Sequence, residues 1–159
     1  MLGIRAQRRA SGFSLIELVI VVAILGILAA IAVPRLSRGA AGATSAQLKS
    51  DLSVLRSSIE LYYAEHNNVY PTVAGWNNQM VAQYSDELGN TNATKAPPFI
   101  YGPYLKATPI LRVGAEKGSS TLASAAASGV AWVYDQNTGQ ISANTGLLKD
   151  DTGVLYTTY

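Results

Sequence analysis

An apolar run near the N-terminus, Phe13 to Val33, constrains this chain more than any other feature. Within the run only Ser14 and Glu17 are polar, and the basic residues that precede it are Arg5, Arg8 and Arg9. As a helix the run would be about 32 Å long, which is enough to cross the hydrocarbon core of a bilayer. The arginines favour a cytoplasmic N-terminus. We therefore expect a membrane-spanning helix over residues 13–33, and its carboxylate needs an explanation.

The remaining chain is long enough for one small domain. With 159 residues, of which 48% are hydrophobic and 14% charged, the chain has room for one core plus one membrane element. Without the three N-terminal arginines, nine basic residues face ten acidic ones, so no basic surface for nucleic acid is indicated. The sequence has no cysteine, which excludes a disulfide framework, a thiolate zinc site and a cysteine nucleophile.

The segment after the apolar run predicts a second, amphipathic helix over residues 34–66. Its apolar positions recur at spacings of four, three, four and three, and charged residues lie on the opposite side of the helix. The apolar positions are Leu48, Leu52, Leu55, Ile59 and Tyr62 or Tyr63. This face should lie on a sheet. Pro34 should bend the helix, and Gly39 and Gly42 predict local melting or close helix packing.

Residues 67–159 predict loops and a small antiparallel sheet. A short helix is expected near residues 77–88, and Val130, Trp132, Tyr134 and Ile141 indicate a hairpin whose five-residue turn ends at Gly139. Residues 114–129 resemble a flexible loop between strands. The expected fold class is α+β, with a long N-terminal helix packed on the sheet.

Two plain interpretations of the N-terminus compete with a specialised one. A secretory signal cleaved after Ala32 would leave a soluble exported domain, but the apolar run is longer than the usual signal core. A simple membrane anchor is the second alternative, with Glu17 reaching the interface. An acid within the bilayer costs about 2.5 kcal/mol or more, and a signal peptide that is removed after export has no function that would require the acid.

The stretch Gly12–Phe13–Ser14–Leu15–Ile16–Glu17–Leu18 resembles the leader junction of type IV pilins and type II secretion pseudopilins. The resemblance covers the basic leader (1–12), the acid at the fifth mature position, the apolar run and Pro34 at the family's helix kink. It implies a pilin-like fold, cleavage between Gly12 and Phe13 by the prepilin peptidase, and N-methylation of Phe13 by the same enzyme.

The resemblance also implies a use for the carboxylate of Glu17. Cleavage would create an ammonium group at Phe13, and a buried charge is tolerable when it is paired. In the family this acid pairs with the Phe13 amine of a neighbouring subunit, which sets the register of a homo-oligomeric filament. Glu17 and Pro34 are therefore the expected assembly residues.

Later motifs resemble the type II secretion major pseudopilin in particular. They are Tyr70–Pro71–Thr72 after the long helix, Gly102 to Leu105, and Pro109. The implied partners are the inner-membrane assembly platform and minor pseudopilins, and the implied location is the cytoplasmic membrane with an extracytoplasmic domain. A surface type IV pilin for adhesion, motility or DNA uptake, the last of which would bind nucleic acid, and an exported or anchored binding domain remain alternatives.

Calcium is the only cofactor to consider. The family usually continues with an Asp-Pro-Trp-Gly segment ahead of a calcium loop, whereas this chain has Pro109–Ile110–Leu111–Arg112. The late aspartates Asp135, Asp150 and Asp151 have no spacing of a known calcium loop, so they are interpreted as turn and tail acids, with metal binding as the alternative.

Catalysis is not expected. The sole histidine, His66, lies beside two asparagines and is interpreted as a solvated residue at a helix end rather than a general base. No serine lies in a G-x-S-x-G turn and no phosphate-binding glycine loop is present. The tyrosines at 62, 63, 70, 101 and 104 are expected to pack the helix against the sheet. A structural, non-enzymatic role follows.

Overall fold

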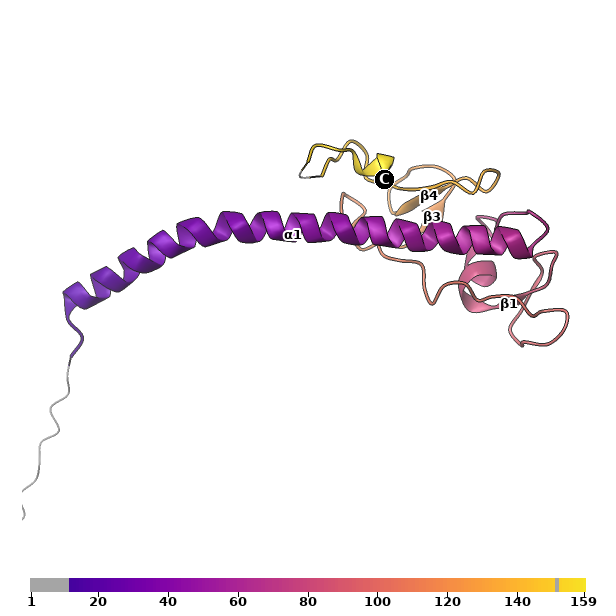
Figure 1. Cartoon of the computed structure of the whole chain (residues 1–159), viewed down its shortest axis with the longest axis horizontal. Coiled ribbons are helices and arrows are strands. Elements are labelled where there is room, and N and C mark those ends of the chain that lie inside the picture. The colour runs from indigo at the N-terminus through magenta and orange to yellow at the C-terminus, as the bar shows by residue number, and fades with distance from the viewer. Residues whose placement is uncertain (1–11, 151) are drawn as a thin grey trace, which may run out of the picture. The chain divides into compact units, whose positions relative to one another are not determined.

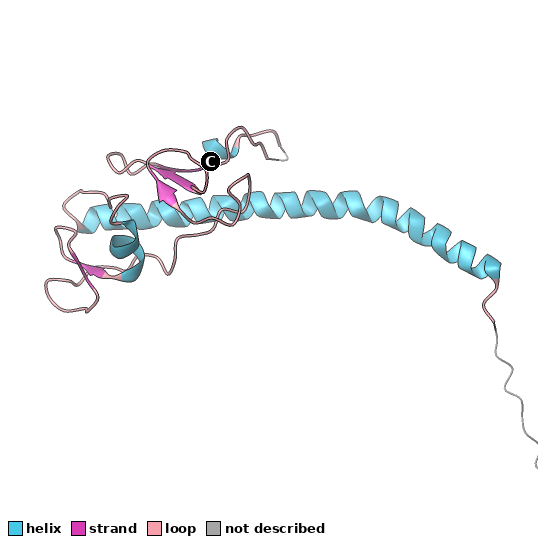
Figure 2. Ribbon diagram, turned by 180° about the vertical axis from the view of Figure 1, so that it is seen from behind, coloured by secondary structure: helices cyan, strands magenta, loops and turns pink. Residues whose placement is uncertain are grey.

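A computed structural model describes residues 12–150 and 152–159, without the side chains of residues 34–38. It has one long helix, α1 (Leu15–Glu65), a short π-helix η1 (Asn77–Ala82), five short strands and a 3-10 turn η2 (Tyr156–Thr158). The chain forms two compact units, Met1–Gly39 and Ala40–Tyr159. Figure 1 shows these elements along the chain, and Figure 2 shows that helix and loop dominate over strand.

The expected α+β fold is confirmed. Strands β1 (Tyr84–Ser85) and β2 (Thr91–Asn92) form an antiparallel pair. A second sheet has the order β3-β4-β5, with β3 at Leu122–Ala123, β4 at Trp132–Tyr134 and β5 at Ile141–Ala143. β4 and β5 form the predicted antiparallel hairpin. β3 pairs with β4 in parallel, so this sheet is mixed rather than purely antiparallel.

The apolar face predicted on the second half of α1 is the core of the unit Ala40–Tyr159. Its five residues Leu48, Leu52, Leu55, Ile59 and Tyr62 are all at most 1% exposed. They pack with Trp132, Tyr134 and Ile141 of the β4–β5 hairpin and with Met80 of η1. A helical stripe and the inward positions of two strands thus form one core, as their periodicities require.

Two asparagines end α1. Asn67 and Asn68 have positive φ angles of 53° and 60°, a conformation that asparagine adopts more readily than most residues. The N–H of Asn68 donates to the carbonyl of Tyr63 at 3.1 Å, which satisfies a carbonyl of the last turn. Beyond this end, Pro71 is fully buried and its carbonyl accepts a hydrogen bond from the Tyr134 hydroxyl at 2.9 Å.

Two local expectations were wrong. α1 continues through Gly39 and Gly42, so the helix does not melt there. A Cβ built at Gly39 would meet nothing within 4 Å beyond its chain neighbours and the helix's own backbone, so close packing within the described chain is absent at Gly39. Alanines at 40, 41 and 43 are strong helix formers and offset the glycines. Residues 114–129 are not simply a loop, because Leu122 and Ala123 pair with β4.

We predict that Gly139→Ala destabilises the unit Ala40–Tyr159 by about 2–4 kcal/mol. Gly139 has a φ of 71°, and a Cβ there would lie 2.6 Å from Cζ of Tyr70. The substitution therefore adds a steric clash to backbone strain. Gly118→Ala is the matched control, since Gly118 has a φ of 94° and a Cβ at that position would lie in open space. Urea unfolding should separate the two, and equal losses would contradict the predicted clash.

Candidate functional site

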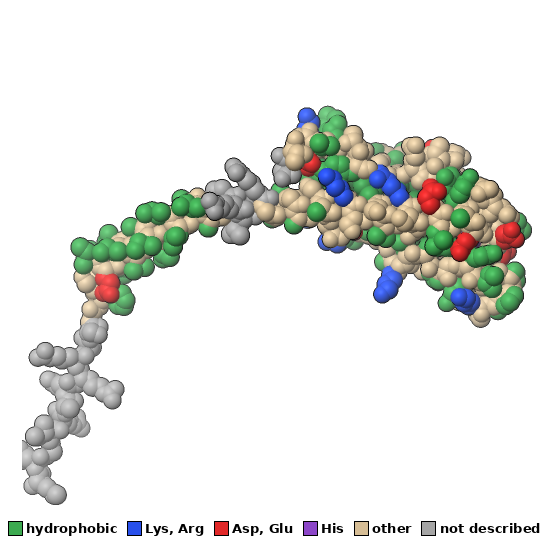
Figure 3. Space-filling view, in the orientation of Figure 1, with side chains coloured by type: hydrophobic (Ala, Val, Ile, Leu, Met, Phe, Trp, Pro, Cys, Tyr) green, Lys and Arg blue, Asp and Glu red, His purple; other side chains and the backbone are tan. Residues whose placement is uncertain are grey.

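The first unit presents an apolar helix face with no partner in the described chain. The span Leu15–Val33 has a mean hydropathy of 3.0, and none of it is buried by other described residues. Phe13 and Leu15 are 78% and 82% exposed. Figure 3 shows apolar side chains covering the visible face of this part of α1. A contiguous apolar surface of this size indicates contact with a membrane or with other protein chains.

Glu17 lies in the first turn of α1, on this exposed surface. The helix starts at Leu15, and the N–H of Leu18 donates to the carbonyl of Ser14 at 3.2 Å. A carboxylate in the first turn interacts favourably with the partial positive charge of the helix N-terminus, by about 0.3–1 kcal/mol. Because Glu17 is only two residues from the helix start, it would lie close to a membrane interface rather than at the bilayer centre, where a charge costs most.

The predicted cleavage junction precedes the helix. Gly12 and Phe13 are exposed and outside α1, and a Cβ built at Gly12 would meet no heavy atom within 4 Å. Non-helical, exposed backbone is the form in which a peptidase cleft can bind a chain. Pro34 lies within α1, but its side chain is outside the described residues. The processing of Gly12 and Phe13, and the bend at Pro34, stay predictions.

His66 is not solvated, contrary to expectation. It is 1% exposed and stacks on Tyr62 with ring centroids 3.7 Å apart. Its Nδ1 lies 2.7 Å from the carbonyl of Tyr62, which can only accept, so Nδ1 carries the proton and donates. Nε2, 2.9 Å from Oγ of Ser85, then accepts from that hydroxyl. His66 therefore joins the end of α1 to β1 as a neutral core residue, with no access for a substrate.

We predict that unit stability rises with pH in the range set by His66. Burial lowers the pKa of His66 below its ordinary value of 6.5, and this outweighs the opposing carbonyl of Tyr62 and carboxylates of Glu65 and Asp86. The folded state thus takes up a proton less readily than the unfolded state. The stabilisation is complete above pH 6.5 and is lost as pH falls from 6.5 through the folded-state pKa.

The measurement is the free energy of unfolding between pH 5.5 and 7.5. His66 is the sole histidine, so no other side chain with an ordinary pKa near 6.5 contributes. His66→Phe keeps an aromatic ring beside Tyr62 and removes the titration. The wild-type slope should be positive and the His66→Phe slope close to zero, and equal slopes in the two proteins would contradict the assignment.

The aspartates considered for calcium hold turns. Both carboxylate oxygens of Asp135 accept hydrogen bonds, from Asn137 and from the Thr138 hydroxyl, which lowers its pKa. Asp150 accepts from Thr152, Val154 and the Tyr159 hydroxyl, and its pKa is also lowered, first by Tyr159. Asp151 lies outside the described residues. Among the residues described, no group of three or more acidic, histidine or cysteine side chains could hold a metal.

The tyrosines pack, as expected, but mostly around the end of α1. Tyr62 meets Tyr104 edge to face at 5.5 Å, and Tyr63 stacks on Tyr70 at 4.3 Å. Burial raises the pKa of Tyr62 to about 12. Burial and a hydrogen bond to Glu65 also raise the pKa of Tyr104. These shifts keep the hydroxyls protonated at physiological pH and fit a packing role.

Arg56 has a structural role that its position in the sequence did not predict. Its guanidinium donates to the carbonyls of Ile141, at 3.3 Å, and Tyr159. It thereby connects α1 to β5 and to the C-terminal segment. Its place in the helical period only showed that it lies outside the apolar stripe, and the carbonyls it binds are 85 and 103 residues away in sequence.

The comparison with known proteins gives a match for the N-terminal segment alone. Residues 7–33 match the family described as the prokaryotic N-terminal methylation motif. A search of curated proteins and a search of solved structures gave no match. The matched range contains the Gly12–Phe13 junction, Glu17 and the apolar span up to Val33. The exposed apolar helix that begins α1 therefore lies within a match to the prokaryotic N-terminal methylation motif.

Proposed function

We propose that this protein is a non-enzymatic structural subunit of a type IV pilus-like filament. The observation that carries the proposal is the methylation motif on a helix whose apolar surface has no partner among the described residues. The subunit is inserted in the cytoplasmic membrane with its N-terminus in the cytoplasm. Prepilin peptidase cleaves it between Gly12 and Phe13 and methylates Phe13, and it then polymerises through α1.

Within this proposal, Glu17 sets the register between subunits. Processing creates an ammonium group at Phe13 that enters an apolar environment when the helices bundle. An unpaired charge there is very unfavourable, whereas a paired and hydrogen-bonded charge is tolerated. The exposed carboxylate of Glu17 on one subunit is available to the Phe13 amine of the next.

The favoured assignment is the major pseudopilin of a type II secretion system. It is supported by Tyr70–Pro71–Thr72 beyond the end of α1, by Gly102 to Leu105, by Pro109 and by the absence of cysteine. Its partners are then the inner-membrane assembly platform and minor pseudopilins, and its filament lies in the periplasm. A surface type IV pilin is the second candidate, because the methylation motif is common to both.

An exported or anchored binding domain is the candidate of a different class. The turn roles of Asp135 and Asp150 give no support to a calcium-dependent version of either class. What separates this candidate from a filament subunit is the behaviour of the first unit, since an anchor or a signal peptide needs neither processing at Gly12 nor Glu17.

Deletion of the gene in its native host tests the pseudopilin assignment. We expect export of type II substrates to stop and surface pili to remain, with export restored by the wild-type gene and not by a Glu17→Ala gene. Loss of surface pili with normal export would instead identify a type IV pilin. Normal export and normal pili would contradict the filament proposal.

A further inference from the structure

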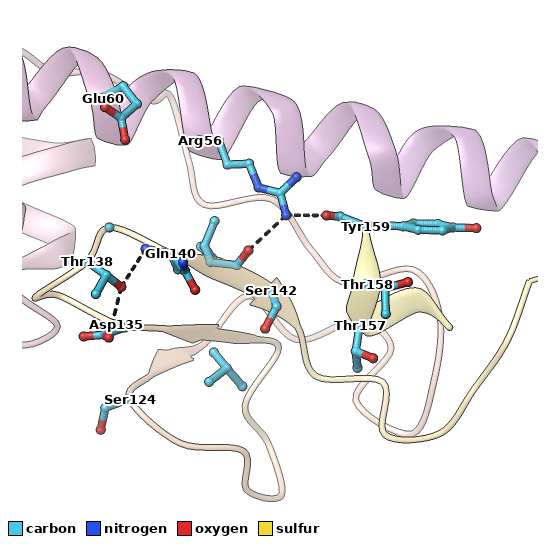
Figure 4. A pocket seen from close by; sticks show the side chains of 13 residues that line it. Arg56, Glu60, Ser124, Asp135, Thr138, Gln140, Ser142, Thr157, Thr158 and Tyr159 are labelled. Carbon is cyan, nitrogen blue, oxygen red and sulfur yellow. Dashed lines mark hydrogen bonds between the residues drawn. The ribbon is translucent and has the colours of Figure 1, made fainter. Parts of the chain in front are cut away.

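A cavity in the second unit is lined only by residues of Ala40–Tyr159. It has a volume of about 680 Å³, which is in the range of sites for small organic ligands. Figure 4 shows Arg56 and Glu60 projecting from α1 on one side, Asp135 and Thr138 at the β4–β5 turn, and the C-terminal residues on the other side. This pocket, called the β5 pocket below, is distinct from the apolar span.

The charged side chains around the β5 pocket have both signs, and Arg56 and Asp135 already make hydrogen bonds within the chain. Arg56 is offset by Glu60 and Asp135, which line the same cavity. The guanidinium already donates to the carbonyls of Ile141 and Tyr159, and Asp135 accepts from its own turn. A strongly anionic ligand would meet two carboxylates, and a cationic ligand would meet Arg56. The pocket therefore suits a neutral ligand.

The side chains of the β5 pocket that are available for hydrogen bonding to a ligand are hydroxyls and an amide. Among the described residues, the side chains of Ser124, Gln140, Ser142 and Thr157 make no hydrogen bond within the chain. An amide both donates and accepts in one plane, and each hydroxyl can do either. Val133, half-buried on the wall, adds an aliphatic surface. This combination matches a molecule that has many hydroxyl groups and an apolar C–H face.

A peptide backbone fits less well, because the carbonyls of Ile141 and Ala143 in β5, and of Gln140 just before it, already accept hydrogen bonds. The carbonyl of Gln140 accepts from Asp135 at 2.9 Å, that of Ile141 from Arg56 at 3.3 Å, and that of Ala143 from Thr145 at 3.0 Å. An added strand needs a row of free donors and acceptors at the edge. Recognition at this pocket must therefore come from side chains.

We propose that the β5 pocket binds a neutral oligosaccharide. Gln140 and Ser142 hydrogen-bond ring hydroxyls, Glu60 accepts from another, and Val133 packs against a sugar ring. Glu60 has room for this, since its only hydrogen bond in the described chain is a long one, 3.5 Å from the Tyr70 hydroxyl. The proposal uses residues of the second unit and does not depend on filament assembly.

Saturation-transfer NMR on the full-length chain tests this inference, with chitotriose and maltotriose as probes. The protein is held in lauryldimethylamine oxide micelles, which carry no sugar headgroup to compete. We expect saturable transfer to at least one probe, a dissociation constant roughly three- to tenfold higher for Gln140→Ala, which loses one or two hydrogen bonds, and no binding for Ser142→Trp, whose indole fills the cavity.

Gln83→Ala is the matched control, because Gln83 is half-buried, makes no side-chain hydrogen bond in the described chain and lies outside the pocket. It should bind like wild type. Near-UV circular dichroism checks that Ser142→Trp is folded. If this variant is not folded, the dissociation constant of Gln140→Ala alone tests the inference. The inference is overturned if neither probe gives saturable transfer, or if Gln140→Ala binds as tightly as Gln83→Ala. It is also overturned if the pocket proves to be a contact between two copies of the chain. In that case probe binding would be lost only when the protein self-associates, because the second copy would fill the pocket.

Discussion

Glu17→Ala should abolish filament assembly while leaving membrane insertion and cleavage intact. In the proposed assembly, the substitution removes the carboxylate that would pair with the new Phe13 ammonium of a neighbour, so each added subunit would bury an unpaired charge. Removing one partner of a buried ion pair costs about 3–5 kcal/mol, which at each interface is a loss of more than a hundredfold in association. The measurement is the sheared or sedimentable filament fraction in a host with the complete assembly system.

Two further variants make the Glu17 experiment specific. Glu17→Gln keeps the shape and removes the charge, so it should behave like Glu17→Ala. Glu87→Ala removes an exposed acid from the second unit, where no ion pair within the described chain holds it, and should assemble normally. Wild-type filament levels with Glu17→Gln would show that the charge is not required for assembly and would contradict the proposed pairing with the Phe13 amine.

Trp132→Ala should have the largest effect on the stability of the second unit. Trp132 is fully buried in β4, and its Nε1 donates to the carbonyl of Pro109 at 2.8 Å. The substitution leaves a large cavity and a carbonyl without its donor, a loss of about 3–5 kcal/mol. Since small domains are stable by about 5–15 kcal/mol, most of the stability could be lost.

Urea unfolding of the full-length chain, followed by the fluorescence of the remaining Trp76, measures this loss. Trp132→Phe is the matched variant, because it keeps an aromatic ring in the core but loses the hydrogen bond and part of the volume. We expect it to lose less than half of what Trp132→Ala loses. A loss under about 1 kcal/mol for Trp132→Ala would contradict the placement of this side chain at the centre of the core.

The sequence predicted those parts of the fold that depend on periodicity. The stripe from Leu48 to Tyr62 repeats with the period of a helix, so its burial followed without knowledge of its partners. The β4–β5 hairpin was similarly local, since the alternation before the turn and Gly139 at its end indicated two adjacent strands. The register was not predicted: Tyr134 pairs with Ile141, one residue beyond the pairing that a five-residue turn would give. The identity of the apolar span also rests on one continuous stretch, which is why the methylation motif could be identified from a short match.

Features that depend on distant contacts could not be predicted in this way. His66 is buried because Ser85 and Tyr101 come back to the end of α1, and nothing beside it in sequence indicates this. Strand β3 has only two residues, too few for a periodic signal, and it exists because β4 offers a free edge. The role of Arg56 follows from the carbonyls of Ile141 and Tyr159, which approach it only in the folded chain.

The candidate assembly site shows the same division. The residue types at Gly12, Phe13 and Glu17 could be identified from sequence, because a peptidase and a helix both act on consecutive residues. The structure adds that Glu17 is exposed in the first turn of α1 and that its surroundings are apolar. Its partner would belong to another subunit, so its role must be measured in the assembled state.

Mass spectrometry of the mature N-terminus tests the central claim most directly. The protein should be purified from a host that has prepilin peptidase, digested, and sequenced through its N-terminal peptide. The account predicts a chain that begins at Phe13 with one methyl group on its amine. A chain that begins at Val33 would identify an ordinary signal peptide, and one that retains the leader from Met1 would identify a plain anchor, and either result would contradict a filament subunit.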